Sequence, residues 1–193
     1  MGQVQLNSIS IARTRATRRF ARALVAGLSL GTASAVAAAQ PYVLPDTASI
    51  SEELQPVTRQ LLDAIEARSV YRAGATLPAV YRLSQPQIEA LVCDEPCNVT
   101  AAFLPGIGVV LAEHLDPVRE LRDRAALLHE LVHALQQGHS RFADMPPCER
   151  ERAKEEEAYA MQNAYLAQIG STARVVFYDG DFDCGGQREP RAQ

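Results

Sequence analysis

The sequence Leu-Leu-His-Glu-Leu-Val-His, residues 127–133, contains the pattern H-E-x-x-H inside an apolar run. On a helix, positions i and i+4 lie on the same face, so His129 and His133 can present two imidazoles to one ion, with Glu130 beside them. Zn²⁺ accepts nitrogen ligands and, in catalytic sites, keeps one position open for water. The metal lowers the pKa of that water, and a neighbouring carboxylate can remove its proton. The pattern therefore predicts a zinc metallopeptidase site on this helix.

An accidental spacing of two histidines is the competing explanation. The chain has only four histidines, at positions 114, 129, 133 and 139, so two of them at ligand spacing would be an unusual coincidence. The flanking residues are also uncharged, as a helix buried beside a metal requires (Leu127, Leu128, Leu131, Val132 and Leu135). Both observations favour metal binding.

Residues 1–39 have the features of a signal peptide. A basic segment without acidic residues (Arg13, Arg15, Arg18, Arg19 and Arg22) precedes an Ala-rich apolar segment at residues 24–36. Ala37, Ala38 and Ala39 then supply the small residues of a cleavage site. The apolar segment contains three hydroxyl residues and is shorter than the ~20 residues of a membrane span. We therefore expect an exported protein, periplasmic or secreted, with no stable membrane span after cleavage.

Cleavage after Ala39 would leave residues 40–193, a length typical of a single domain. The 154 remaining residues would contain 14 basic and 23 acidic side chains, a net charge of −9. This balance argues against nucleic acid as a partner and is compatible with a peptide or protein substrate.

Four cysteines, at positions 93, 97, 148 and 184, lie in the part expected to be exported. An even number of cysteines in such a chain predicts two disulfides. Of the three pairings, we favour Cys93–Cys97, which closes a short loop, and Cys148–Cys184, which joins distant segments. A cysteine metal site is the competing interpretation and fits an oxidising compartment less well.

The hydrophobic pattern predicts an α+β domain. Helices are expected where apolar residues recur at helical spacing between capping residues (52–68, 84–93, 116–137 and 149–169). Strands are expected where β-type residues run between turn residues (77–83, 99–104, 108–115 and 174–178). Asp116 and Pro117 are typical of a helix start, whereas Gly138 and Gly170 are typical of helix ends.

A catalytic zinc site usually has a third protein ligand, and two candidates compete. His139 would complete the pattern H-E-x-x-H-x-x-x-x-x-H, which has the ligand spacing of metzincin peptidases. Those proteins have glycine three residues after the second histidine, where this chain has Gln136. If the helix continues to Gln137, His139 points well around the helix from His133.

The second candidate is a glutamate in Lys-Glu-Glu-Glu-Ala-Tyr, residues 154–159. This segment resembles the E-x-x-A-D or E-x-x-A-N pattern of gluzincin-like peptidases, in which the first glutamate binds the metal. Aligning Ala158 with the alanine of that pattern makes Glu155 the ligand. Glu157 is the fallback, because side chains two residues apart cannot both face one ion. Tyr159 departs from the pattern, since it stands where those families place the Asp or Asn that orients a histidine.

Over residues 99–170 the chain thus resembles the zincin superfamily, on the gluzincin side, in a small single-domain form. The resemblance implies an active-site helix and a ligand helix packed on a short β-sheet. It also implies Zn²⁺ held by His129, His133 and Glu155, and peptide hydrolysis with Glu130 as the general base. In many zincins an edge strand above the motif helix pairs with an extended substrate, and residues 108–115 are expected to form that strand.

The remaining roles have several candidates. A donor to the developing oxyanion could come from Tyr159, Tyr165, Tyr178 or His114. Gln162 and Asn163 could orient the histidines. The competing function is a non-catalytic exported binding module that keeps an H-E-x-x-H helix around a structural metal. Such a module has no need of the Glu130 carboxylate, which therefore distinguishes the two functions.

Overall fold

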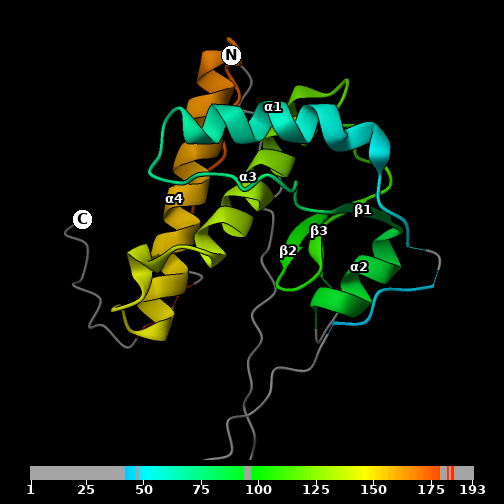
Figure 1. Ribbon diagram of the computed structural model, residues 1–193, viewed down its shortest axis with the longest axis horizontal. Helices are drawn as coiled ribbons and strands as arrows, with labels where there is room; N and C mark the ends of the chain where they lie inside the picture. Colours follow the sequence, from blue (N-terminus) through cyan, green and yellow to red (C-terminus); the bar gives the residue numbers. More distant parts are fainter. Residues whose placement is uncertain (1–41, 47, 94–96, 179–181, 183, 185–193) are drawn as a thin grey trace, which may run out of the picture.

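The computed structural model describes residues 42–46, 48–93, 97–178, 182 and 184. Within this part, four α-helices and a three-stranded mixed sheet form a small α+β fold (Figure 1), which confirms the expected fold class. The signal peptide expected at residues 1–39 lies outside the described residues. None of the described helices is both long and apolar enough to cross a membrane.

The sheet has the strand order β1-β3-β2. Strand β1 (Val80–Leu83) is parallel and strand β2 (Ala101–Leu104) is antiparallel to the central strand β3 (Gly108–Ala112). All five residues of β3 are buried. Because successive side chains of a strand point to opposite faces, both faces of β3 are covered.

The prediction that residues 108–115 form an edge strand is wrong, because β3 is paired on both sides. The hairpin with β2 occupies one side, and on the other the Val109 N–H donates to the carbonyl of Ala79 at 2.8 Å. On the outer edge of β1, Tyr81 forms an isolated antiparallel β-bridge with Ile50. In the described part of the chain, the open edge of the sheet is therefore that of β2.

A type II turn joins β2 to β3 at residues 105–107, between two of the strands that the sequence predicts. Pro105 supplies the fixed φ of the first central position, and Gly106, with φ of 81°, supplies the positive φ of the second. The Ile107 N–H donates to the carbonyl of Leu104 at 3.0 Å. The turn thus fixes the register of the two strands.

The helices pack around the sheet and one another: α1 (Gln55–Glu66), α2 (Gln85–Val92), α3 (Leu121–Gln137) and α4 (Pro147–Gln168). Short 3-10 helices precede α1 and α4: η1 (Glu52–Leu54) and η2 (Ser140–Phe142). Helix α3 contacts α1, α4, β2 and β3, and Figure 1 shows α1 crossing it and α4 running beside it. Its residues 125–132 are all buried. The H-E-x-x-H segment therefore lies at the centre of the fold.

Helix α3 begins at Leu121, later than the start at Asp116 that the sequence predicts. Asp116 does act as a cap, because its Oδ1 accepts the N–H groups of Val118 and Arg119, both at 3.1 Å. These bonds close a separate turn before the helix. Glu120, in an extended conformation, is the N-cap of α3.

Both long helices end where glycines predict. Gly138 is the C-cap of α3. After α4, Gly170 has φ of 75° and its N–H donates to the carbonyl of Ala167 at 3.1 Å. The Ser171 N–H donates to the carbonyl of Leu166 at 2.9 Å. These two bonds form a Schellman motif, which satisfies carbonyls that the helix leaves open.

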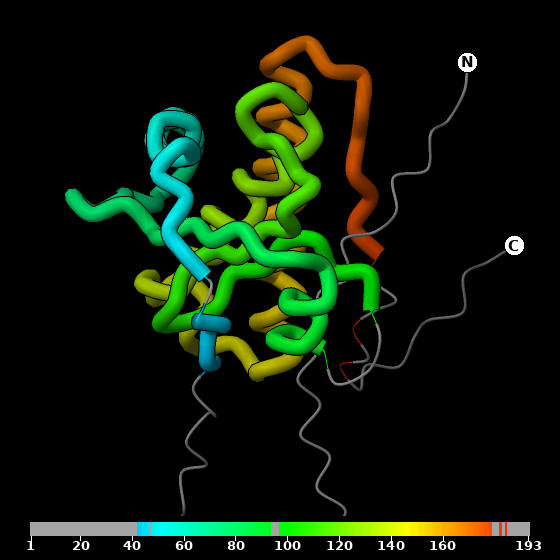
Figure 2. Tube along the Cα trace, turned by 90° about the vertical axis from the view of Figure 1, so that its right-hand side faces the viewer, coloured from blue at the N-terminus to red at the C-terminus, as the bar shows by residue number. Residues whose placement is uncertain are grey.

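Residues 174–178 do not form the strand that the sequence predicts. The Asn163 side chain takes the place of a ladder partner: its Nδ2 donates to the carbonyl of Val175, and its Oδ1 accepts the Val175 N–H, both at 2.8 Å. Figure 2 shows this segment as an extended arm alongside the helices (orange).

The two predicted disulfides are confirmed. Cys93 is bonded to Cys97, and Cys148 to Cys184. The second bond joins the first turn of α4 to the segment beyond the extended arm, 36 residues further along the chain.

Candidate metal centre

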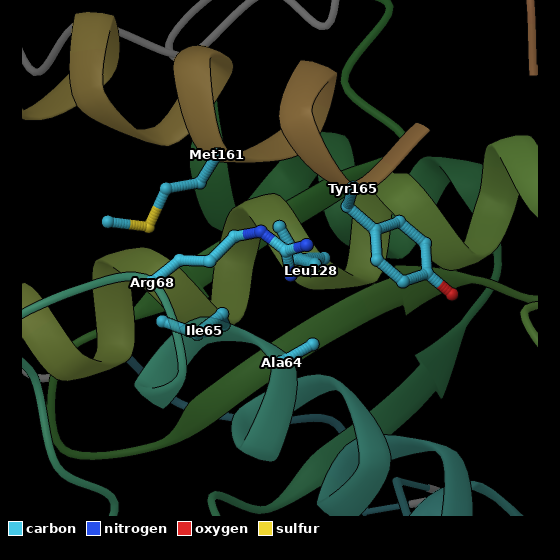
Figure 3. A pocket seen from close by; sticks show the side chains of 6 residues that line it. All are labelled: Ala64, Ile65, Arg68, Leu128, Met161 and Tyr165. Carbon is cyan, nitrogen blue, oxygen red and sulfur yellow. The ribbon is translucent and has the colours of Figure 1, made fainter. Parts of the chain in front are cut away.

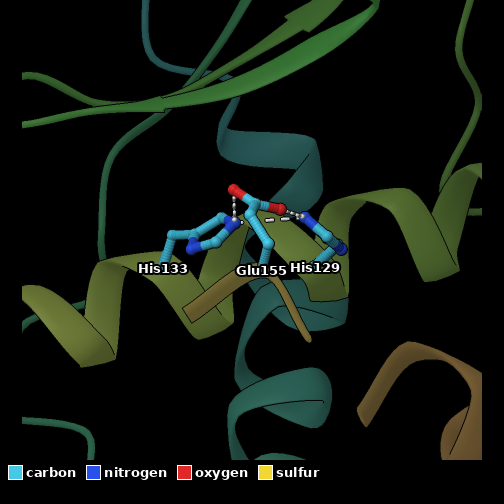
Figure 4. Close-up of side chains that lie close together, drawn as sticks. All are labelled: His129, His133 and Glu155. Atoms are coloured by element: carbon cyan, nitrogen blue, oxygen red, sulfur yellow. Dashed lines mark hydrogen bonds and ion pairs between the residues drawn. The ribbon is translucent and has the colours of Figure 1, made fainter. Parts of the chain in front are cut away.

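Helices α3 and α4 bring together three side chains whose atoms could hold a metal ion. His129 and His133 project from α3, and Glu155 projects from α4 between them (Figure 4). His129 is fully buried and Glu155 is 6% exposed. The helical spacing of the two histidines and the packing of α3 on α4 therefore create one donor group.

The donor atoms of this group are close enough together to surround a single metal ion. Bonds of ~2.0–2.1 Å in a tetrahedral arrangement place two ligand atoms roughly 3.3 Å apart. The two histidine Nε2 atoms are 3.1 Å apart, the Oε1 of Glu155 lies 3.2 Å from the Nε2 of His133, and its Oε2 lies 3.3 Å from the Nε2 of His129. With one ligand atom taken from each residue, the three atoms lie within 4.8 Å of one another. Among the described residues, the buried Oε2 of Glu155 has no well-oriented hydrogen-bond donor. The residues present therefore fit a bound metal ion.

The pKa values of Glu155 and His133 are shifted by their mutual contacts. Burial alone would raise the pKa of Glu155, but its contacts with His129 and His133 outweigh burial and hold the pKa at about 2. Burial alone would lower the pKa of His133, but Glu155 and Glu130 outweigh it and raise the pKa to about 9. Without metal the group is thus an ion pair, and His133 must lose a proton before its nitrogen can bind a metal.

Glu130 lies on α3 next to His129 and is only 2% exposed. Burial raises the pKa of its carboxyl group, and the nearby His129 and His133 only partly offset this effect. A backbone hydrogen bond from Phe103 in β2 reaches the carboxylate. Its Oε1 has no hydrogen-bond partner among the described residues. The carboxylate is therefore anchored yet keeps an oxygen that can accept a proton.

The other two ligand candidates lie outside the donor group of the described residues. Glu157 accepts hydrogen bonds from the Tyr71 hydroxyl and the Gln136 amide. His139 is exposed and caps η2, where its Nδ1 accepts the N–H of Arg141. The structure thus places Glu155, and not these two residues, beside the histidines.

Of the four residues considered as oxyanion donors, Tyr159 contacts a member of the donor group. Its ring lies edge-on to that of His129, with 4.5 Å between the centroids. Tyr165 lines a small pocket between α1, α3 and α4 that none of the three donors lines (Figure 3). Tyr178 and His114 are exposed, and no described contact joins either to the donor group.

Neither residue expected to orient a histidine has that contact. Asn163 binds the extended arm, and Gln162 is buried with no partner for its Oε1 in the described part of the chain. The Nδ1 atom of His129 likewise has no hydrogen-bond partner there. Tyr159, at the position where gluzincins place Asp or Asn, contacts the His129 ring edge-on.

Three residues near the site are absent from the sequence-based prediction: Gln136, Tyr71 and Phe103. The Oε1 of Gln136 lies 2.8 Å from the Nδ1 of His133. This contact had a signal in the sequence, because residues three apart share a helix face. Tyr71 and Phe103 come from a loop and a strand distant in sequence, so no local pattern indicates them.

No protein-family model matches the chain, and no curated protein or solved structure matches it either. The functional interpretation therefore rests on the residues and geometry described above.

Proposed function

We propose that this protein is an exported zinc-dependent metallopeptidase. The observation that carries the proposal is the convergence of His129 and His133 from α3 with Glu155 from α4. The buried Glu130 carboxylate lies on α3, next to His129. A structural metal site would require the three ligands but not Glu130. The two disulfides are compatible with export into an oxidising compartment.

In this proposal, His129, His133 and Glu155 hold the metal. A bound Zn²⁺ supplies Lewis-acid polarisation and lowers the pKa of a water molecule in the site. With the metal bound, Glu130 would serve as the general base that takes a proton from the attacking water and as the acid that returns it to the nitrogen of the leaving amine. The burial that raises the pKa of Glu130 favours this exchange, because a base works best when its pKa approaches the working pH.

The open edge of β2 is the part of the sheet suited to bind an extended peptide. Val109 directs its N–H to β1, so the backbone groups of its antiparallel partner Phe103 point away from β3. The Phe103 N–H already donates to Glu130, so its carbonyl is the group left for a peptide. The hydrogen bond from Phe103 to Glu130 places this edge beside the general base. A peptide added to β2 would therefore pass close to Glu130.

A peptide-library digest tests the proposal, with the purified protein and two glutamine variants each assayed for bound zinc. Glu130→Gln should keep zinc and the fold but lower cleavage by ~10²–10⁴, the usual contribution of a positioned acid–base group. Glu156→Gln is the matched control, because this exposed side chain undergoes the same change of charge. It should cleave like the wild type.

Unchanged cleavage by the Glu130→Gln variant would exclude the proposed mechanism. Absence of cleavage by zinc-loaded wild-type protein across a broad library would instead favour the metal-stabilised binding module.

A further inference from the structure

Gln136 lies on α3 one turn after the second histidine of the motif and is 2% exposed. A buried side-chain amide is costly unless both of its ends are hydrogen-bonded. The amide of Gln136 meets this requirement with partners from two helices. Its contacts are therefore specific enough to fix its orientation.

The partners of the amide determine which end faces His133. The carbonyl of Lys154 and the Oε2 of Glu157, each 3.0 Å from the Gln136 nitrogen, can only accept hydrogen bonds. The NH₂ group must therefore face α4. This leaves the Oε1 of Gln136 opposite the Nδ1 of His133, at 2.8 Å. Because Oε1 is an acceptor, that Nδ1 must carry a proton.

A protonated Nδ1 leaves Nε2 of the neutral imidazole as the nitrogen with a free lone pair. The Nε2 of His133 is the atom that faces Glu155 and His129. We propose that Gln136 is a positioning residue that holds His133 in the tautomer and orientation required to bind the metal through Nε2. This inference rests on the metal site of the proposed function and not on peptide hydrolysis.

The acceptor that orients Gln136 is itself held in place. Glu157 accepts a hydrogen bond from the buried Tyr71 hydroxyl and pairs with Arg141 at 3.3 Å. Burial and the Glu157 carboxylate raise the pKa of Tyr71, so the phenol stays protonated and donates. The loop after α1 and the segment before α4 therefore support the second metal ligand through Glu157 and Gln136.

His129 differs from His133 in this respect. Its Nδ1 has no hydrogen-bond partner in the described part, whereas Nδ1 of His133 has Gln136. We therefore expect the effect of Gln136 to be confined to His133.

Zinc affinity, measured by competition with a chromophoric chelator, tests the proposal in the purified protein. Gln136→Leu should weaken zinc binding about 10–100-fold, the usual effect of removing a group that orients a metal-binding histidine. Gln137→Leu is the matched control, because Gln137 is the neighbouring residue but is exposed. It should bind zinc as tightly as the wild type.

Equal affinity of the wild type and the Gln136→Leu variant would overturn the role of Gln136 and leave the metal site intact. Absence of zinc binding by the wild type would overturn both.

A ¹⁵N spectrum of the zinc-loaded histidines provides a second test, and its first part uses only the wild-type protein. It should show His133 bound through Nε2, with a slowly exchanging proton on Nδ1. In zinc-saturated Gln136→Leu protein that proton should exchange with solvent at least about tenfold faster, as expected when a buried hydrogen bond is lost. Zinc bound through Nδ1 of His133 in the wild type would contradict the proposal.

Discussion

Glu155, Glu156 and Glu157 are consecutive on α4 but have three different environments. Glu155 faces the two histidines, Glu156 is exposed, and Glu157 binds Tyr71 and Gln136. A helix turns by about 100° per residue, so neighbouring side chains cannot share one target. The environment of each glutamate therefore depends on the rotation of α4 against α3.

Gly108 is a residue at which an added methyl group would disturb the sheet. Its φ is 133°, and a Cβ there would lie 2.3 Å from the carbonyl oxygen of Ala79, which pairs with Val109. We expect Gly108→Ala to lower the free energy of unfolding by about 1–3 kcal/mol, the range of strained backbone positions. Urea unfolding measures the loss. Gly74→Ala, where the Cβ meets open space, should change stability by less than about 0.5 kcal/mol. Equal stability of both variants would contradict the strain at Gly108.

At the scale of elements, local signals predict most of the helices and the hairpin. The capping box of Ser84 and Gln87 opens α2, and Pro105 with Gly106 closes the hairpin. Each of these features depends on residues within a few positions of one another, so it can be recognised from the sequence alone. Asp116 misleads because the same capping chemistry can close a single turn as well as begin a helix.

The extended arm at residues 174–178 shows a limit of local prediction. Its β-type composition is real, but the partner that satisfies Val175 is a side chain of α4. The position of β3 at the centre of the sheet likewise depends on pairing with β1, which is distant in sequence. Strand pairing between distant segments is not encoded in the local pattern.

Replacement of Asn163 should release the extended arm. Asn163→Ala removes two hydrogen bonds to the backbone of Val175, and we expect a loss of about 1–3 kcal/mol in stability. Hydrogen exchange of the Val175 amide should accelerate most. Gln168→Ala, at an exposed position of the same helix, is the control and should leave that amide protected. Unchanged protection of Val175 in the Asn163 variant would contradict the contact.

For the whole molecule, the two disulfides should contribute unequally. The Cys148–Cys184 bond has a sequence separation of 36 and the Cys93–Cys97 bond one of 4, which correspond to roughly 4 and 2 kcal/mol in the chain-entropy model. Replacing each pair by serines should therefore lower stability more for the first pair. Denaturant unfolding under non-reducing conditions measures both. A larger loss for the short loop would show that chain entropy does not govern these bonds.

The candidate site is a property of the whole fold. The sequence indicates His129, His133 and Glu130 through one motif, and it indicates Glu155 through a resemblance on the next helix. The spacing of three residues allows Gln136 to contact His133 within α3, but the orientation of the Gln136 amide depends on how α4 packs on α3. The motif thus identifies the candidate ligands, whereas the packing of distant elements determines how their side chains are oriented.

Zinc content of the purified protein tests the central claim most directly. After saturation and removal of free metal, elemental analysis should find about one Zn²⁺ per chain in the wild type and in the Glu156→Gln control. His129→Ala, His133→Ala and Glu155→Gln should lose most of it, because two remaining ligands hold zinc poorly. Stoichiometric zinc persisting in a double His129→Ala/His133→Ala variant would contradict the account.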